Sequence, residues 1–294
     1  MQELYLQYKG LVFTLAYQLT GSVSDAEDVV QDVFLKIHGV EPERLTNPKA
    51  YLCRMATNRC RDLLKSARRK REQYFGEWLP EPIFTSREES LHAVIRGELL
   101  SYAMLVLLER LTPAERAVFV LREALNFEYA EIAEVVGKSE ANCRKLLSRA
   151  REKMKIVGNE PTRPEAADEA WIRRMLSALE QDDAEAVVSL LAENVVLVSD
   201  GGGKAVAAVH PIKTKDSVAK FLLGLFRQVP HYKGGVRIEI REINGQPAVA
   251  VRSGGEIETV LLIHAGRNAI RNLFFVRNPD KLRHLNTGQT EDKR

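Results

Sequence analysis

The fold of the front half of the chain depends most on residues Phe127–Lys155, which read FEYAEIAEVVGKSEANCRKLLSRAREKMK. Apolar residues recur at helical spacing on both sides of Gly137, so the stretch predicts two helices joined by a tight turn. Glycine tolerates the left-handed conformation that ends a helix, and Ser139 can cap the helix that follows. Two helices that cross closely around such a turn form a helix-turn-helix motif.

The exposed face of the second predicted helix carries side chains that bind phosphates and base edges. They are Asn142, Arg144, Lys145, Ser148 and Arg149, followed by Arg151 and Lys153. A helix with this chemistry fits the major groove of DNA, so the pattern predicts DNA binding. An ordinary helical hairpin with a solvated basic face is the alternative, and the motif alone leaves it open.

The bulk properties indicate a globular protein of more than one domain. The chain has 294 residues, enough for two or three domains, and a formal net charge of only +3. Nucleic-acid binding must therefore come from the segregation of charge and not from its total. No apolar run is long enough to cross a bilayer, and Met1–Lys9 lacks the apolar core of a signal peptide. Three cysteines without CxxC spacing favour a reduced, cytoplasmic protein.

The first two predicted helices lie near the N-terminus. Helical periodicity runs through Tyr5–Gln18, and the capping box Ser24–Glu27 predicts the start of a second helix. The exposed face of that second helix is acidic and polar. Its residues are Asp25, Glu27, Asp28, Gln31 and Asp32. This strip is either simply solvated, with favourable charge at a helix N-terminus, or a docking surface for a basic partner.

A densely basic helix follows. Asn47-Pro48 predicts its start, and Arg54–Arg71 contains a single acidic residue. The polar and basic residues of interest are Asn58, Arg59, Arg61, Lys65, Arg68 and Arg69. The aromatic residues Tyr74, Phe75 and Trp78 come next, and basic charge followed by aromatics suits a melted DNA strand. The alternative is a solvated helix end.

Proline-rich segments divide the rest of the chain. Trp78–Pro82 breaks the basic helix, Thr112–Glu115 combines an N-cap, a proline and a capping glutamate, and Asn159–Pro164 marks a boundary. Beyond it, amphipathic helices precede alternating strands, which predicts an α+β unit behind an all-helical front half. The strands are expected at Val195–Ser199, Ala205–Val209, Val236–Ile243, Ala248–Arg252, Glu256–His264 and Ala269–Val276.

The front half resembles the extracytoplasmic-function (ECF) sigma factors. The matching residues are Ser24–Phe34, Tyr51–Leu64 and Leu111–Met154. Trp78–Pro82, Asp200–Lys204 and Asn278–Leu282 resemble a subgroup with a fused C-terminal SnoaL-like domain. The resemblance implies a multidomain fold: two all-α helical sigma domains, the second with the helix-turn-helix, followed by an α+β SnoaL-like cone-shaped barrel.

The resemblance also divides the chain and implies its partners. Residues 1–75 would be sigma region 2, for polymerase docking and the −10 element; 76–105 the linker; 106–158 sigma region 4, for the −35 element; and 165–290 the SnoaL-like regulatory domain. Core RNA polymerase and promoter DNA are the implied partners, with no membrane, cofactor or metal and no catalytic step. The cone of a SnoaL-like domain has a pocket, which leaves room for a small-molecule ligand.

Each group of residues then has an implied role. The acidic strip docks on basic clamp helices of the polymerase, the basic helix holds a melted promoter strand with Asn58 at a flipped base, and Asn142 to Arg149 meet the major groove. Control in cis is expected from contacts between the linker and the back domain. The residues expected to make them are Trp78, Leu79, Pro80, Asp200, Gly201, Gly202, Gly203, Lys204, Asn278, Pro279 and Asp280.

Two other functions stay open. In one, the back domain is an isomerase- or cyclase-type enzyme or a ligand sensor attached to a DNA-binding protein. Some SnoaL-like proteins use an acid and a histidine, for which the candidates are Asp182, Asp183, Asp200, His210 and His264. In the other, the chain is a repressor that binds DNA without polymerase. We expect no enzyme, because no acid–base pair is forced by the spacing.

Overall fold

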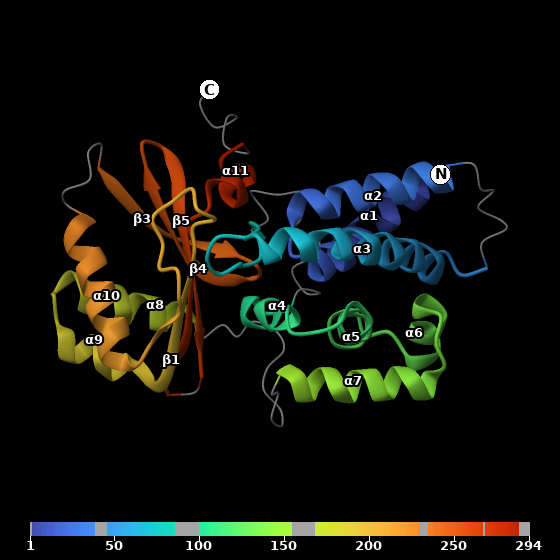
Figure 1. Cartoon of the computed structure of the whole chain (residues 1–294). Helices are drawn as coiled ribbons and strands as arrows, with labels where there is room; N and C mark the ends of the chain where they lie inside the picture. The colour runs from blue at the N-terminus through green and yellow to red at the C-terminus, as the bar shows by residue number, and fades with distance from the viewer. Residues whose placement is uncertain are drawn as a thin grey trace. The chain divides into compact units, whose positions relative to one another are not determined.

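A computed structural model describes residues 2–38, 46–85, 100–154, 168–229, 235–266 and 268–287, without the side chains of residues 66–72, 168 and 287. The chain forms two compact units (Figure 1). Unit 1 consists of Met1–Glu72 and Val94–Pro164, and unit 2 of Gln73–Ala93 and Glu165–Arg294. The residues after the basic helix therefore fold with the back of the chain. Among the described residues, no helix is long and apolar enough to span a bilayer.

Unit 1 begins with three helices. They are α1 (Gln2–Thr20), α2 (Val23–Ile37) and α3 (Pro48–Glu72). The start predicted for α2 at Ser24 is wrong, because Ser22 is the N-cap and its side chain accepts a hydrogen bond from the Asp25 amide. The start predicted for α3 is confirmed, since the Asn47 side chain accepts from the Ala50 amide at 3.1 Å.

The remaining helices of unit 1 contain the helix-turn-helix. They are α4 (Tyr102–Leu108), α5 (Pro113–Phe119), the π-helical turn η3 (Val120–Ala124), α6 (Tyr129–Val136) and α7 (Glu140–Met154). Thr112 and Glu115 form the predicted capping box. Gly137 has φ of 65° and ψ of 44°, and the Ser139 hydroxyl accepts from the Asn142 amide, so the predicted turn and cap are confirmed.

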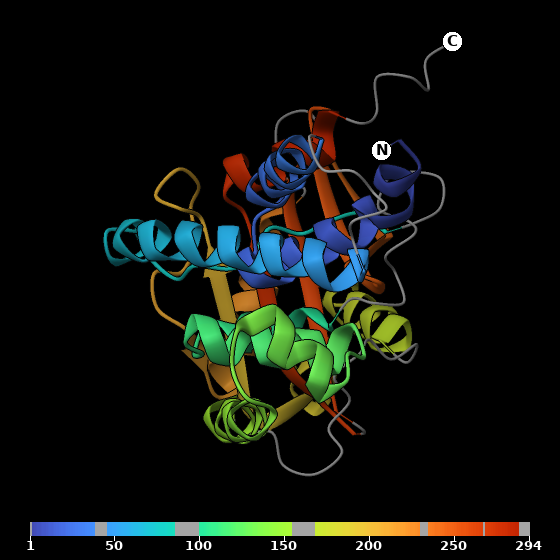
Figure 2. The ribbon, with the colours of Figure 1, turned by 90° about the vertical axis from the view of Figure 1, so that its right-hand side faces the viewer.

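The two groups of helices in unit 1 pack on each other (Figure 2). The buried Arg116 of α5 donates to the Leu19 carbonyl at 2.8 Å and pairs with Glu109 at 2.9 Å. The Leu100 amide donates to the side chain of Gln18, also buried, at 2.9 Å. These contacts join the first three helices to the helix-turn-helix half in one compact body.

Unit 2 is built on one six-stranded sheet in the order β2-β1-β6-β5-β4-β3. Its strands are β1 (Leu191–Asp200), β2 (Ile212–Lys213), β3 (Val236–Ile243), β4 (Gln246–Ser253), β5 (Glu256–Ala265) and β6 (Ile270–Val276). β1 runs parallel to β6, and every other neighbouring pair is antiparallel. The fold class expected from the sequence, helical sigma domains and then an α+β domain, is confirmed.

Helices close one face of this sheet. They are α8 (Asp168–Glu180), α9 (Ala184–Leu190) and α10 (Lys215–Gln228), while α11 (Pro279–Thr287) packs against β5 (Figure 1). The apolar core lies between α8, α9 and α10 on one side and the sheet on the other. The strand predicted at Ala205–Val209 is wrong, because this segment is an irregular loop with bends at Ala205 and Val209. The Asn244-Gly245 turn is confirmed, with φ of 54° and 69°.

Candidate functional site

The acidic strip lies on the solvent face of α2. Glu27, Asp28 and Gln31 are exposed, and Asp25 is half-buried. Partial burial, together with the charge of Asp28, raises the pKa of Glu27, as expected where negative charges crowd together. Asp32 pairs with Arg59 at 2.6 Å. The strip thus offers an exposed concentration of negative charge, with one carboxylate held by the neighbouring helix.

The basic residues of α3 lie mostly in solvent. Asn58, Arg61 and Lys65 are exposed, and Lys65 pairs with Asp62 at 3.2 Å. The side chains of Arg68 and Arg69 lie outside the described residues. The aromatics that follow do not all point to solvent: Tyr74 and Trp78 are half-buried in unit 2, whereas 63% of Phe75 is exposed.

The helix-turn-helix presents the predicted side chains on one face of α7. The five candidates Asn142, Arg144, Lys145, Ser148 and Arg149 are all exposed. The other face is buried through Cys143, Leu146, Leu147, Ala150 and Met154. The guanidinium of Arg144 lies 4.5 Å from the centre of the Tyr129 ring and pairs with Glu140 at 2.9 Å. The arrangement is a basic, solvent-facing helix on a packed support, which suits a DNA groove.

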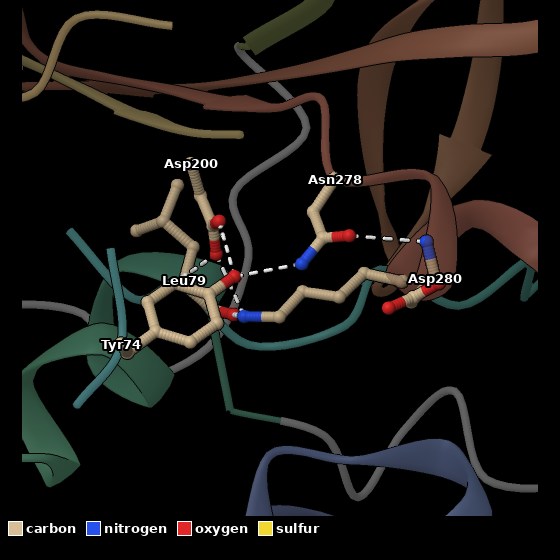
Figure 3. A network of polar contacts seen from close by, with 6 residues as sticks. Tyr74, Leu79, Asp200, Asn278 and Asp280 are labelled. Atoms are coloured by element: carbon tan, nitrogen blue, oxygen red, sulfur yellow. Dashed lines mark hydrogen bonds and ion pairs between the residues drawn. The ribbon is translucent and has the colours of Figure 1, made fainter. Parts of the chain in front are cut away.

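Residues 73–85, called the linker from here on, are held by Asp200, a carboxylate of the back domain that is fully buried (Figure 3). One oxygen of Asp200 accepts from the Tyr74 hydroxyl at 2.6 Å. The other accepts from the Leu79 amide at 2.8 Å and from the Lys281 ammonium at 2.7 Å. Burial, and next the hydrogen bond to Asp200, raises the pKa of Tyr74, so the phenol stays protonated as a donor.

α11 and the residues before it complete this network. The Asn278 side chain donates to the Tyr74 hydroxyl at 2.7 Å, and its carbonyl oxygen accepts from the Asp280 amide (Figure 3). Lys281 also donates to the Leu79 carbonyl, and its ammonium lies 4.1 Å from the centre of the Trp78 ring. The polar groups of Leu79 are therefore both satisfied by the back domain, which fixes the backbone of the linker.

The glycine turn after Asp200 makes room for the linker. Gly202 has φ of 57°, and a Cβ there would lie 2.2 Å from Asn278 and 2.8 Å from the Tyr74 hydroxyl. Gly203 has φ of 72°, and a Cβ there would approach the Phe75 side chain at 3.4 Å. Glycine is thus required by both the backbone conformation and the close approach of the linker.

A second set of contacts holds the end of the linker segment. The Ile83 amide donates to the Asn244 side chain at 3.1 Å, and Ile83 accepts from the Asn244 amide at 2.8 Å. Phe84 forms an antiparallel bridge with Ile243. The His284 ring donates to the Pro82 carbonyl at 2.6 Å, and burial lowers the pKa of His284, which favours the neutral ring. Residues 74–85 are therefore fastened at both ends.

The residues proposed for catalysis are not gathered at one site. Asp182 pairs with Arg227 through two hydrogen bonds of 2.9 Å, Asp183 caps α9, and Asp200 holds the linker. His264 contacts Asn272 at 3.1 Å, and His210 is exposed. None of the five lines the cavity of unit 2. Within the described ranges, no cluster of His, Cys, Asp or Glu could hold a metal ion.

The sequence reasoning missed several residues of the linker site. Lys281, Asn244 and His284 were not proposed, although each contacts the linker. A signal for α11 was present, because Asn278-Pro279 repeats the N-cap and proline pattern of Asn47-Pro48. Recognising that start would have placed Lys281 in the first turn of a helix. The structure does bring Leu79 and Asp200 into direct contact, and Asn278 contacts Asp200 through its backbone amide and Tyr74 through its side chain.

Comparisons with known proteins cover nearly the whole chain. Residues 4–70 match the family described as Sigma-70 region 2, and residues 101–154 match the one described as Sigma-70, region 4. The chain is 35% identical over 286 residues to the ECF RNA polymerase sigma factor SigJ of Mycobacterium tuberculosis, covering 92% of this chain and 89% of that protein. It is 27% identical to the ECF RNA polymerase sigma factor SigG of the same species, covering 87% and 75%.

A solved structure gives the same picture. The crystal structure of the Mycobacterium tuberculosis extracytoplasmic function sigma factor SigJ matches with a TM-score of 0.78 and 30% sequence identity. The match covers 97% of this chain and 99% of that one. It therefore includes both the helical front half and the α+β unit with its attached linker segment.

Proposed function

The chain belongs to the ECF RNA polymerase sigma factors. We propose which of its surfaces bind polymerase, which bind DNA and which control these interactions. As a sigma factor it binds core RNA polymerase and directs promoter-specific transcription initiation. Separate groups of residues are proposed to bind polymerase and DNA, and unit 2 is proposed to control these two interactions. The observation that carries this proposal is the buried Asp200, which fastens the segment between the two sigma regions.

The acidic strip of α2 is proposed as the polymerase-docking surface. It consists of Asp25, Glu27, Asp28, Gln31 and Asp32. Exposed negative charge complements a basic partner surface and accelerates encounter with it. Asp28 is the best residue to test, because it is exposed and is no part of the Asp32–Arg59 ion pair.

Asp28→Lys is expected to weaken binding to core RNA polymerase at least tenfold, about 1.4 kcal/mol or more, because it places a positive charge against a basic surface. The measurement is a titration of core polymerase with labelled protein, followed by run-off transcription from a cognate promoter. Glu185→Lys is the matched control, since it makes the same charge change at an exposed site of α9. Equal binding by the two variants would remove the strip from the interface.

The DNA-binding surfaces are proposed on α3 and α7. The residues of α3 are Asn58, Arg59, Arg61, Lys65, Arg68 and Arg69, and those of α7 are Asn142, Arg144, Lys145, Ser148 and Arg149. The first set would hold a melted strand near the −10 element, with Asn58 at a flipped base. The second would lie in the major groove at the −35 element.

Arg149→Ala is expected to weaken promoter binding and to lower the slope of log K against log salt by about one unit, because one phosphate contact is lost. The measurement is binding of a polymerase complex to promoter DNA over a range of salt concentrations. Arg173→Ala removes an exposed arginine of unit 2 and serves as the control. A slope that does not change with Arg149→Ala would exclude a phosphate contact there.

Compact unit 1 is too small to occupy both promoter elements. The −10 and −35 elements are about 25 base pairs apart, which is about 85 Å along B-form DNA at 3.4 Å per base pair. A compact body of about 140 residues has a radius of gyration of about 14 Å, hence a diameter of about 40 Å. We infer that the two sigma regions must separate before they bind both elements, and that the linker has to permit this separation.

Unit 2 is proposed to control that separation through the linker. The thirteen residues 73–85 could span about 40 Å if extended at 3.3 Å each, but here they follow one fixed path. Tethering two weak DNA contacts raises affinity only if the linker can span both sites. Release of the linker from Asp200 and Asn244 would therefore increase the fraction of molecules that bind both elements.

A further inference from the structure

Unit 2 contains an apolar cavity that the sigma-factor role does not use. Its volume is about 90 Å³. α8 contributes Met175 and Leu179 to its wall, and α10 contributes Leu222, Leu225 and Phe226. The sheet side includes Phe275 of β6. An apolar cavity of this kind favours an apolar molecule over water.

The polar residues of the cavity lie together at one end. Strand register places the end of β4, the start of β5 and the end of β6 side by side, since Val251 pairs with Thr259 and Val260 with Val276. Among the described residues of the lining, the polar ones are Ser253, Glu258, Thr259 and Arg277. Ser253 and Thr259, which both carry a hydroxyl group, line this end of the cavity. A ligand with one polar group could therefore be oriented there.

The wall of the cavity continues into the linker site. Phe275 and Arg277 line the cavity, and the amides of Arg277 and Asn278 donate to the Asp200 carbonyl at 2.8 and 2.9 Å. Arg277 also donates to the Val206 carbonyl, just after the glycine turn, while Asn278 donates to Tyr74. A shift of β6 on filling the cavity would thus reach the groups that hold the linker.

We propose that this cavity binds a compact, mostly apolar molecule with one hydroxyl or carbonyl group, about the size of a single aromatic ring, and that its occupancy alters the linker contacts through Arg277 and Asn278. The binding site stands on the cavity alone, whereas the second half rests on the proposed control by the linker. The described lining includes the carboxylate of Glu258 but no histidine, so we propose that the ligand is bound and not converted.

The test uses the full-length protein with labelled methyl groups and labelled tryptophan indoles, titrated with phenol and, for comparison, benzene. Phenol is expected to cause saturable shifts of the Met175 and Leu222 methyl signals. Only two tryptophans are present, so the indole signal of Trp78 reports on the linker. Its signal is expected to move with the same saturation curve as the methyl signals.

Two variants make the assignment specific. Leu225→Trp fills the cavity and is expected to weaken phenol binding at least tenfold, whereas Leu35→Trp, at a residue of α2 that is 66% exposed, leaves it unchanged. Thr259→Val is expected to weaken phenol binding several-fold without affecting benzene. Absence of saturable shifts, or shifts that persist in Leu225→Trp, would overturn the binding site. Methyl shifts with an unchanged Trp78 signal would overturn the coupling to the linker. Neither readout involves polymerase or DNA, so either failure leaves the sigma-factor assignment intact.

Discussion

Lys281→Met is expected to destabilise unit 2 by about 3–5 kcal/mol, because it leaves a buried carboxylate without its cation. The side chains of Lys281 and Asp200 are only 7% and 0% exposed, and their charged atoms lie 2.7 Å apart. Methionine keeps much of the length of the lysine side chain but can neither neutralise Asp200 nor donate to the Leu79 carbonyl. The linker would lose its central anchor together with the stability.

Urea unfolding of the full-length protein measures this effect, and cleavage within residues 73–85 by a protease at low urea reports on the linker itself. Lys204→Met is the matched control, because the ion pair of Lys204 is with Asp280 of the back domain and not with the linker. Lys204 also pairs with an aspartate, Asp280, but both side chains are more than half exposed. Such a pair contributes about 0–1 kcal/mol. Similar unfolding curves for the two variants would show that Lys281 does not anchor the linker.

Gly202→Ala is expected to cost more than the strain of a left-handed alanine. That strain is about 1–2 kcal/mol for a non-glycine residue. At Gly202 the new methyl group would also displace Asn278 and the Tyr74 hydroxyl, and a broken buried hydrogen bond adds about 1–3 kcal/mol. We therefore expect a total loss of about 2–5 kcal/mol and increased cleavage near Tyr74.

Gly254→Ala isolates the contribution of the linker contact. Gly254 has nearly the same φ, 58° against 57°, but nothing lies within 4 Å of the position of its Cβ. It should show the backbone strain alone. Unfolding free energies of the two alanine variants in the same buffer give the difference directly. If Gly202→Ala were no more destabilising than Gly254→Ala, the linker would not pack closely against the glycine turn.

Local sequence signals predicted most of the helices and strands. The residues that begin or end a helix act on backbone groups close to them in the sequence, so the sequence alone reveals them. These capping contacts reach backbone groups no more than four residues away, as seen for Thr112 with Glu115, for Asn47 with Pro48, and for Gly137. The exposed face of α7 followed from helical spacing alone. The error at the start of α2 has the same origin, since Ser22 and Ser24 are both acceptable caps and sequence spacing does not choose between them.

The linker site could be predicted only in outline, because the residues in contact are separated by 81 to 204 positions in the sequence. Resemblance indicated Leu79, Asp200 and Asn278, but nothing local to Lys281 or Asn244 reveals that they meet the linker. The segment Ala205–Val209 is a short apolar run like that of a buried strand, yet Val206 is 85% exposed. A short apolar run alone cannot distinguish such a loop from a strand that pairs.

Run-off transcription with core RNA polymerase and a cognate promoter shows whether unit 2 limits the sigma regions by holding the linker through Asp200. Intact protein, Lys281→Met and Lys204→Met are compared at concentrations that saturate polymerase. We expect at least twofold more transcript from Lys281→Met, because the freed linker lets both promoter elements be bound, and no change from Lys204→Met. Equal or lower transcript from Lys281→Met, with polymerase binding intact, would contradict this role of unit 2.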